Sequence, residues 1–398
     1  MEQKVGKVLI FNPSCEMAVR QDRLSYTPPR QIAQMEHDLS TLMMFVAEEG
    51  DAVVSEKPDE ELMTMWRQIF GNISFATQQE ACSLIKNGMR FSPWGHSKAS
   101  FNRFGIMEKA KGWTWREILS RRSSVAVERK FAEIAGVRLA ANPLFADDYE
   151  TLQKAVEENL LEGMGIVVKS LWSASGRGVR FFSTEEREQA MLYGENCLRA
   201  DGGVVVEKRL KRIAEFSFLF DFKGGETKYI GINRYHSTAS GNMGWEVHGP
   251  QPYIYDLSQL TDEITTAAKC LVKALTEILD GSGYEGPVGV DAMIHEEADG
   301  KIGLRACTET NIRHCMGHVA KGVTRAFAPE TSIRWRMNHF GDKGEWDEYC
   351  REQSLADPIK RDENGLITSG FFRLTPLGSE IHFGAFGWAG ENGVCKEL

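Results

Sequence analysis

Residues 167–179 read VVKSLWSASGRGV, and this stretch guides the interpretation of the whole chain. Lys169 directly follows the apolar run Ile166–Val168, so its ammonium group must reach water, a carboxylate or a phosphate. The loop Ser173–Gly178 comes next, and its glycines and small residues let backbone N–H groups approach an anion closely. A second strand is expected over 179–182. The stretch predicts an anion site between two strands, although a simple turn can have the same composition.

Helices and short strands alternate around this stretch. A helix is expected over Ser124–Ala135, ending at Gly136, and two capping-box patterns, at Asp147 and Ser183, open further helices. Strands are expected at 166–169, 179–182 and 204–206. The pattern indicates one α/β unit over residues 116–207.

The N-terminal residues 1–115 are expected to form a separate α/β domain. An apolar strand at Val8–Phe11 precedes a helical face at 32–46, which follows Pro28-Pro29, and a strand at Asp51–Ser55. This β-α-β order predicts a parallel sheet. Two helices are expected at 60–70 and 78–87, and an irregular loop at 91–96.

Paired strands are expected in the second half of the chain. Phe216–Phe222 and Thr227–Asn233 flank the turn Lys223–Gly225, and Val288–Ile294 and Lys301–Thr308 flank Asp299-Gly300. A long amphipathic helix is expected over 261–280. The tail beyond residue 365 alternates Phe, Ile and Gly, which predicts a terminal hairpin.

Composition and charge exclude several classes of protein. The 398 residues are 42% hydrophobic and 26% charged, as in ordinary globular proteins. The net charge of −9 argues against binding of duplex nucleic acid, which needs a basic face. The eight cysteines include no C-x-x-C pair, which indicates thiols in a reducing compartment. No signal peptide or membrane span is recognised, so a cytoplasmic protein is expected.

Polar residues also end the other predicted strands. Glu207 closes Val204–Val206, where a carboxylate can accept a hydrogen bond from an exocyclic amine, and Glu215 lies eight residues further on. Asp291 lies inside the apolar strand 288–294, where a bare carboxylate is costly unless it is paired or metal-bound. For each glutamate alone, surface salt bridging is the simpler explanation.

Glu309, Asn311 and Arg313 end the strand that begins at Lys301. Residues two apart on a strand face the same way, so Glu309 and Asn311 point together. With Asp291 on the neighbouring strand, these oxygen ligands suit Mg²⁺. The guanidinium of Arg313 could stabilise transferring phosphoryl oxygens. An ion-pair network is the alternative.

Taken in order, four motifs resemble the ATP-grasp superfamily, in which two α/β subdomains hold ATP between them. They are VVKSLWSASGRGV at 167–179, VVVEKRL at 204–210 with Glu215 beyond it, VGVD at 288–291 and ETNIR at 309–313. The resemblance covers residues 116–325. It implies a small subdomain at 116–207 and a large one with the metal site at 208–330. Residues 1–115 would match the preceding domain of such ligases, and 331–398 would be a C-terminal β extension.

The resemblance also implies a nucleotide site. Lys169 would contact the α- and β-phosphates, and the loop with Ser175, Gly176 and Gly178 would close over them. The adenine would be held by Glu207 and by the backbone of Lys208 and Leu210, and the ribose by Glu215.

The metal and catalytic residues follow from the same resemblance. Asp291, Glu309 and Asn311 would bind one or two Mg²⁺ (or Mn²⁺) ions, and Arg313 would face an acyl phosphate. One departure concerns a second phosphate-binding lysine of the family, whose position here is Ser124. Arg121 or Arg122 could substitute for it.

Other candidates lie outside these motifs. Arg234 and His236 precede a polar Gly-rich loop at 237–244, and such loops often contact substrate, so Arg234 is a catalytic candidate; a solvent-exposed loop is an equal alternative. His314 and His318 lack the glutamate of a zinc-protease helix and favour a structural or substrate-shaping role. Asn12 and Glu16, after the first strand, are weak candidates for an acceptor site.

The expected activity is an ATP- and Mg²⁺-dependent ligase that converts a small-molecule carboxylate into an acyl phosphate for attack by an amine or a thiol. A small-molecule kinase on the same scaffold and a nucleotide-binding protein without turnover are the alternatives. No nucleic-acid or membrane partner is expected, and a homodimer is compatible with the sequence.

Overall fold

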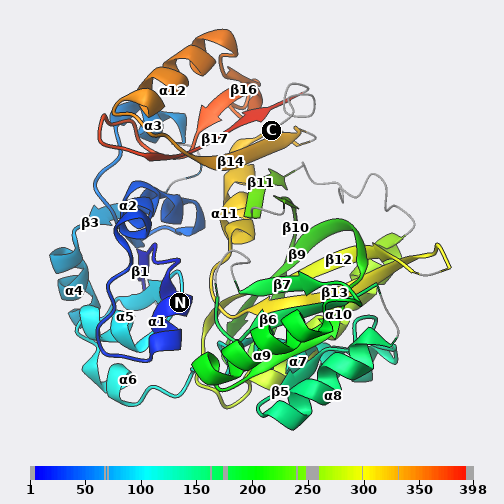
Figure 1. The fold of residues 1–398 in the computed structure, drawn as a ribbon. Coiled ribbons are helices and arrows are strands. Elements are labelled where there is room, and N and C mark those ends of the chain that lie inside the picture. The colour runs from blue at the N-terminus through cyan, green and yellow to red at the C-terminus, as the bar shows by residue number, and fades with distance from the viewer. Residues whose placement is uncertain are drawn as a thin grey trace.

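A computed structural model describes residues 5–66, 69, 71–161, 164–173, 178–238, 241–247, 260–297, 299–329 and 331–390, with backbone alone for 236–238 and 241–247. The described strands form three sheets. Figure 1 shows the N-terminal domain on one side of the molecule, and on the other the small lobe, which contains β6 (Ile166–Ser170), and the large lobe, which contains β12 (Gly286–Glu296). None of the helices in these ranges is long and apolar enough to cross a membrane.

The N-terminal domain has the expected parallel sheet, in the order β3-β2-β1-β4. Its strands are β1 (Lys7–Ile10), β2 (Ala52–Val54), β3 (Ser74–Ala76) and β4 (Arg90–Pro93). Its helices are α1 (Cys15–Gln21), α2 (Arg30–Asp38), η1 (Ser40–Val46), α3 (Glu60–Met65), α4 (Gln78–Lys86), α5 (Lys98–Arg103) and α6 (Met107–Lys111).

Two local predictions in this domain were wrong. The helical face expected at 32–46 belongs to two helices, because α2 ends at Asp38 and a tighter 3-10 helix, η1, follows after Leu39. The loop expected at 91–96 begins as strand β4, which pairs with β1 despite its proline; Pro93 lies at the end of this edge strand, where a missing N–H is tolerated.

The small lobe holds the antiparallel sheet β5-β8-β6-β7. Its elements are β5 (Leu144–Ala146), α8 (Tyr149–Leu160), β6 (Ile166–Ser170), β7 (Val179–Phe182), α9 (Arg187–Asp201) and β8 (Val204–Lys208). The preceding helix, α7 (Arg121–Ala135), packs mainly against α10 (Thr261–Leu279) and β13 (Ile302–Asn311) of the large lobe. Ile166, Val168, Val204 and Val206 share a core with residues of α8 and α9. The alternating positions on β6 and β8, including Lys169 and Glu207, therefore face away from these helices.

A nine-stranded sheet runs through the large lobe to the C-terminal region, in the order β13-β12-β9-β10-β11-β14-β17-β16-β15. Its strands are β9 (Lys211–Lys223), β10 (Glu226–Thr238), β11 (Gly241–Val247), β12 (Gly286–Glu296), β13 (Ile302–Asn311), β14 (Ile333–His339), β15 (Lys360–Arg361), β16 (Ile367–Arg373) and β17 (Phe383–Ala389). The helices are α10 (Thr261–Leu279), α11 (Met316–Val323), η3 (Thr324–Ala326) and α12 (Glu345–Ala356). The predicted terminal hairpin is present as β16 and β17, and β14 and β11 join it to the large-lobe strands.

The two faces of the large-lobe strands have different chemistry. Phe216, Phe218, Phe220 and Phe222 alternate along β9 and pack with Val288 and Val290 of β12 against α10. Ser217 and Asp291, which are paired across β9 and β12, lie on the opposite face. The functional candidates of β12 are thus placed on the face away from α10.

A glycine in α11 controls how closely this helix packs on the N-terminal domain. A Cβ atom at Gly322 would collide with the backbone carbonyl oxygen of Phe45 in η1. We expect Gly322→Ala to lower the free energy of unfolding by about 3 kcal/mol, because backbone has to move. In Gly341→Ala, a matched control with open space around the new methyl group, the change should stay within about 0.5 kcal/mol. Urea unfolding of both variants tests this, and equal stability would contradict the packing described.

Candidate active site

Lys169 connects the small lobe to the edge strand of the large lobe. Its Nζ lies 2.8 Å from Glu207 Oε1 on the adjacent strand β8, and it donates a hydrogen bond of 3.1 Å to the carbonyl oxygen of Thr308 on β13. Both side chains are buried, with 7% of Lys169 and 3% of Glu207 exposed. The two residues predicted to bind phosphate and adenine are therefore in direct contact.

Two further residues complete a buried ionic network, consisting of Glu128, Lys169, Glu207 and Arg305. Arg305 of β13 donates two hydrogen bonds of 2.9 Å to Glu207 and two of 2.9 Å to Glu128 of α7. Burial alone would raise the pKa of Glu207, but the charges of Arg305 and Lys169 lower it to about 2. Burial raises the pKa of Glu128 against the effect of Arg305. The network ties α7, β6, β8 and β13 together.

The predicted metal ligands meet where β12 and β13 pair. Asp291 lies directly across from Glu309, and Asn311 Nδ2 donates a hydrogen bond of 3.0 Å to Asp291 Oδ2. Ser217 Oγ donates a hydrogen bond of 2.6 Å to the other Asp291 oxygen. Burial, followed by the negative charge of Glu309, raises the pKa of Asp291 to about 6. Two carboxylates and an amide oxygen, with excess negative charge at the pair, fit a hard divalent cation such as Mg²⁺.

Arg121 of α7 contacts the predicted metal ligand Glu309. This first residue of α7 is 5% exposed; its Nη2 lies 3.0 Å from Glu309 Oε1, and its Nη1 donates to Ser170 O at 2.7 Å and Ser173 Oγ at 2.8 Å. Arg122 points elsewhere, with its guanidinium 4.7 Å from the ring centre of Phe145. Of the two arginines considered, only Arg121 joins the cluster.

Ser124 makes a structural contact with β13. Its Oγ accepts a hydrogen bond of 2.9 Å from the backbone N–H of Thr310. This bond fixes α7 against β13 next to Glu309. Arg121, Ser124 and Glu128 are spaced three and four residues apart, so one face of α7 carries all three toward the site.

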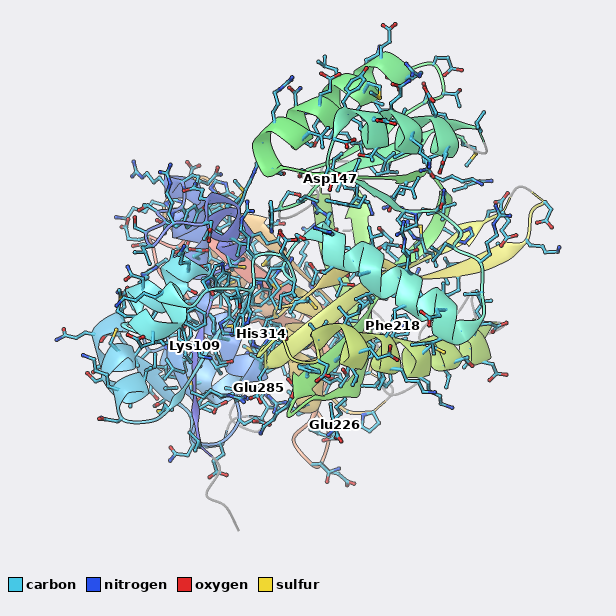
Figure 2. All side chains as sticks on the ribbon, turned by 90° about the horizontal axis from the view of Figure 1, so that it is seen from below. Lys109, Asp147, Phe218, Glu226, Glu285 and His314 are labelled. Atoms are coloured by element: carbon cyan, nitrogen blue, oxygen red, sulfur yellow. The ribbon has the colours of Figure 1, made fainter. Side chains whose placement is uncertain are left out.

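The N-terminal domain closes a cavity at this end of the site. Arg313 Nε donates a hydrogen bond of 2.8 Å to Glu16 Oε1 of α1, and its Nη2 donates one of 2.7 Å to Asn311 Oδ1. The cavity is lined from three sides: by Cys15, Glu16, Val19, Gly95 and His96 of the N-terminal domain, by Leu119, Ser120 and Arg121, and by Leu171–Ser173 and Glu309–Arg313. Figure 2 shows His314, the next residue after Arg313, at the centre of the molecule between the N-terminal domain and the large lobe.

Arg234 does not join this cluster. On β9, Ser217 pairs with Asp291 of β12 on one side and with Asn233 of β10 on the other. Its neighbour Phe216 pairs with Ala292 and Arg234 in the same way. Paired residues of neighbouring strands share a face, so Arg234 is on the face of α10, opposite Asp291. This position does not support the predicted catalytic role of Arg234, because a one-residue step along a strand reverses the direction of the side chain.

The remaining predicted residues lie at the nucleotide end or outside the described ranges. Glu215 is on the same face as Ser217 and accepts a hydrogen bond of 2.7 Å from Arg212. The backbone N–H of Lys208 donates to Ala141 O at 2.8 Å, and Leu210 is half-buried just after β8. Gly178 donates its N–H to Ser173 Oγ at 3.1 Å. Ser175 and Gly176 lie outside the described residues.

The histidines near the site have mainly structural contacts. His318 Nδ1 accepts a hydrogen bond of 3.1 Å from the backbone N–H of Cys315, and its Nε2 lies 3.3 Å from Phe220 O. The His314 backbone N–H donates to Trp94 O at 2.8 Å. Asn12 Nδ2 donates a hydrogen bond of 2.8 Å to the carbonyl oxygen of Gly95, a residue of the cavity wall. Glu16, the other acceptor-site candidate, lines the cavity itself.

Sequence reasoning missed Arg305 and Glu128. Arg305 lies inside an otherwise apolar strand segment, the same signal that identified Asp291. Glu128 could have been found from its spacing to Arg121 and Ser124 on a helix whose other face packs in the core.

Comparison with known proteins identifies the fold. No protein-family model matches the sequence, and no curated protein is significantly similar to it. Among solved structures, biotin carboxylase from Campylobacter jejuni, in a complex with β,γ-ATP, matches at 13% identity with a TM-score of 0.52, covering 98% of this chain and 88% of that chain.

Two further structures match over nearly the whole chain. The biotin carboxylase domain of 2-oxoglutarate carboxylase from Hydrogenobacter thermophilus, with MgADP, ADP and bicarbonate, matches at 14% identity with a TM-score of 0.51, covering 97% of this chain and 87% of that chain. N5-carboxyaminoimidazole synthetase from Staphylococcus aureus matches at 11% identity with a TM-score of 0.50, covering 99% and 95%. The fold expected from the motifs is confirmed: the chain has the ATP-grasp fold.

Proposed function

We propose that the protein is an ATP- and Mg²⁺-dependent ligase that activates a small-molecule carboxylate as an acyl phosphate for attack by an amine or a thiol. One observation carries the proposal: cationic Lys169 and Arg121 converge with Asp291, Glu309 and Asn311, from separate parts of the chain, beside a cavity. The nucleotide complexes of the structures with the same fold support it.

The nucleotide would lie between the two lobes. Lys169 and Arg121 would contact the phosphates, under the loop that contains Ser175, Gly176 and Gly178. Glu207 and the backbone of Lys208 and Leu210 would hold the adenine, and Glu215 the ribose. Lys208 would use its carbonyl oxygen, because its N–H is bonded to Ala141.

Asp291, Glu309 and Asn311 would hold Mg²⁺ (or Mn²⁺), which would neutralise phosphate charge during transfer. The Asp291 and Glu309 carboxylates face each other across two paired strands, so the ligands are positioned by the sheet. Arg121, already 3.0 Å from Glu309, would hold an oxygen of the transferring group.

Arg313 would stabilise the negative charge of the acyl phosphate. Asn311 and Glu16 fix its guanidinium beside the metal ligands, so no reorientation is needed during the reaction. Because charge neutralisation and positioning supply the catalysis, no protein nucleophile is required. Among the nearby thiols, burial raises the pKa of Cys315 to about 12, which disfavours a thiolate.

The cavity beside Arg313 and Glu16 would admit the carboxylate and the nucleophile. It lies between the N-terminal domain and the ends of β6 and β13, so both substrates would reach the phosphate end of the site. The seven cysteines in the described part of the chain are free thiols, which supports a reducing, cytoplasmic location.

An ADP-release screen tests the proposal. The purified protein, with ATP and Mg²⁺, would be given amino acids and small carboxylates, each alone and with an amine or a thiol. We expect ADP and free phosphate in equal amounts only with a matching pair. A phosphorylated acceptor without free phosphate would identify a kinase instead, and binding of ATP without any ADP across the panel would contradict turnover.

A further inference from the structure

Glu207, the residue predicted to contact the adenine base, is held by a buried ionic network. Glu128, Lys169, Glu207 and Arg305 are each at most 7% exposed. Two cations and two anions balance, and Arg305 donates to all four carboxylate oxygens of the two glutamates. Buried charges of this kind stabilise a fold poorly compared with apolar residues of similar size. Stability alone is therefore a weak reason for Arg305 and Glu128 to be charged.

The contacts of Glu207 show what the network does to this carboxylate. Oε1 receives hydrogen bonds from both Lys169 and Arg305, at 2.8 and 2.9 Å, whereas Oε2 receives one, from Arg305 Nη2 at 2.9 Å. An ionised carboxylate oxygen can accept about two hydrogen bonds, so Oε2 retains one acceptor position. An ionised carboxylate is also acceptor-only, so it pairs with an amino group and repels a carbonyl oxygen.

Arg305 becomes essential when Lys169 engages a phosphate. Lys169 would then leave Glu207, and without Arg305 a buried carboxylate would have no cation beside it and would take up a proton. A protonated carboxyl group can donate to the 6-oxo group of guanine. With Arg305 in place and anchored on the other side by Glu128, Glu207 stays ionised and can only accept, as the 6-amino group of adenine requires.

We propose that Arg305, held by Glu128, is a positioning residue that keeps Glu207 ionised and oriented, and that it thereby sets the preference of the site for adenine over guanine nucleotides. The inference rests on the proposed function, because it takes the base to lie at Glu207. It assigns a role to two residues, on α7 and β13, that none of the sequence motifs includes.

The test compares the affinities of two nucleotide analogues, AMPPNP and GMPPNP, with Mg²⁺ by isothermal titration calorimetry. The variants are Arg305→Lys, Arg305→Gln and Glu207→Gln of the full chain. The wild type should prefer AMPPNP by at least about tenfold, which one hydrogen bond to a charged group accounts for. Arg305→Gln and Glu207→Gln should lose most of this preference, and Arg305→Lys, which keeps the charge, should retain part of it.

Arg187→Lys is the matched control, because Arg187 also pairs with a glutamate in the small lobe, Glu157 at 2.7 Å, but on the surface. It should keep the wild-type preference. A merely structural network would weaken both analogues by the same factor, so an unchanged preference in folded Arg305→Lys and Arg305→Gln would overturn the inference. If Arg305→Gln fails to fold, the other two variants still decide. Failure of the wild type to bind AMPPNP would overturn the proposed function as well.

Discussion

Replacing Glu309 by glutamine should reduce ATP turnover by about a thousandfold, because a bound metal ion contributes several kcal/mol to transition-state charge stabilisation. Glu309 is the carboxylate that lies opposite Asp291 and contacts Arg121. Glutamine keeps the size of the side chain but removes the charge that a divalent cation needs. The measurement is the rate of ADP formation with the substrates found by the screen, with the Mg²⁺ dependence of AMPPNP binding as a second readout.

Glu296→Gln is a suitable control for this variant. Glu296 ends β12 on the same pair of strands, and its carboxylate is 2.7 Å from Lys211 at the surface. It should retain wild-type turnover, and circular dichroism should show that both variants are folded. Normal ADP production by folded Glu309→Gln would count strongly against the metal site.

Arg121 and Arg122 are adjacent on α7, and we expect their replacement by alanine to have very different effects. Arg121→Ala should weaken AMPPNP binding and lower turnover by at least about a hundredfold, as expected when a preorganised charge contact to the reacting group is removed. It should also lower the free energy of unfolding by about 3–5 kcal/mol, because Glu309 would lose its buried partner. Arg121→Lys should restore part of the activity and part of the stability, because lysine carries the positive charge but lacks the planar guanidinium group with its several donors.

Arg122→Ala removes the same side chain one residue along the helix. Arg122 is exposed, stacks on Phe145 and lies 3.6 Å from Glu117, so about 1 kcal/mol of stability and little affinity should be lost. Calorimetric titration with AMPPNP and urea unfolding of the three variants give both quantities. Similar losses in Arg121→Ala and Arg122→Ala would show that the structure has assigned the wrong arginine to the site.

Most of the fold could be predicted from local patterns in the sequence. The strand that carries Lys169, the hairpins of the large lobe and the helix ended by Gly136 each have a clear apolar period or a turn signal, and the structure contains them. The split at Leu39 could not be predicted, because α2 and η1 both contribute to one apolar face and differ only in how tightly the backbone is wound.

The candidate site was predictable where a polar residue interrupts an apolar strand. This signal identified Asp291 and Lys169, and applied to β13 it would have identified Arg305 as well. Arg234 was selected by a different signal, its position beside a polar loop, which gives no information about which face of β10 the residue occupies. Strand register between β9 and β10 decides that face, and register depends on partners that are distant in the sequence.

The contact between Arg313 and Glu16 could not be predicted from either residue alone. The two are 297 positions apart, and only the docking of the N-terminal domain on the end of β13 brings them together. The cavity beside them is a product of the same docking, since all three parts of its lining come from different regions of the chain.

A crystal structure of the full chain with AMPPNP and Mg²⁺ tests most directly whether the residues described form one nucleotide site. We expect the phosphates within hydrogen-bonding distance of Lys169 and Arg121, the metal ion bound by Asp291, Glu309 and Asn311, and the base beside Glu207. A nucleotide bound away from Lys169 and Glu309, or its absence from crystals grown at saturating concentration, would contradict the account.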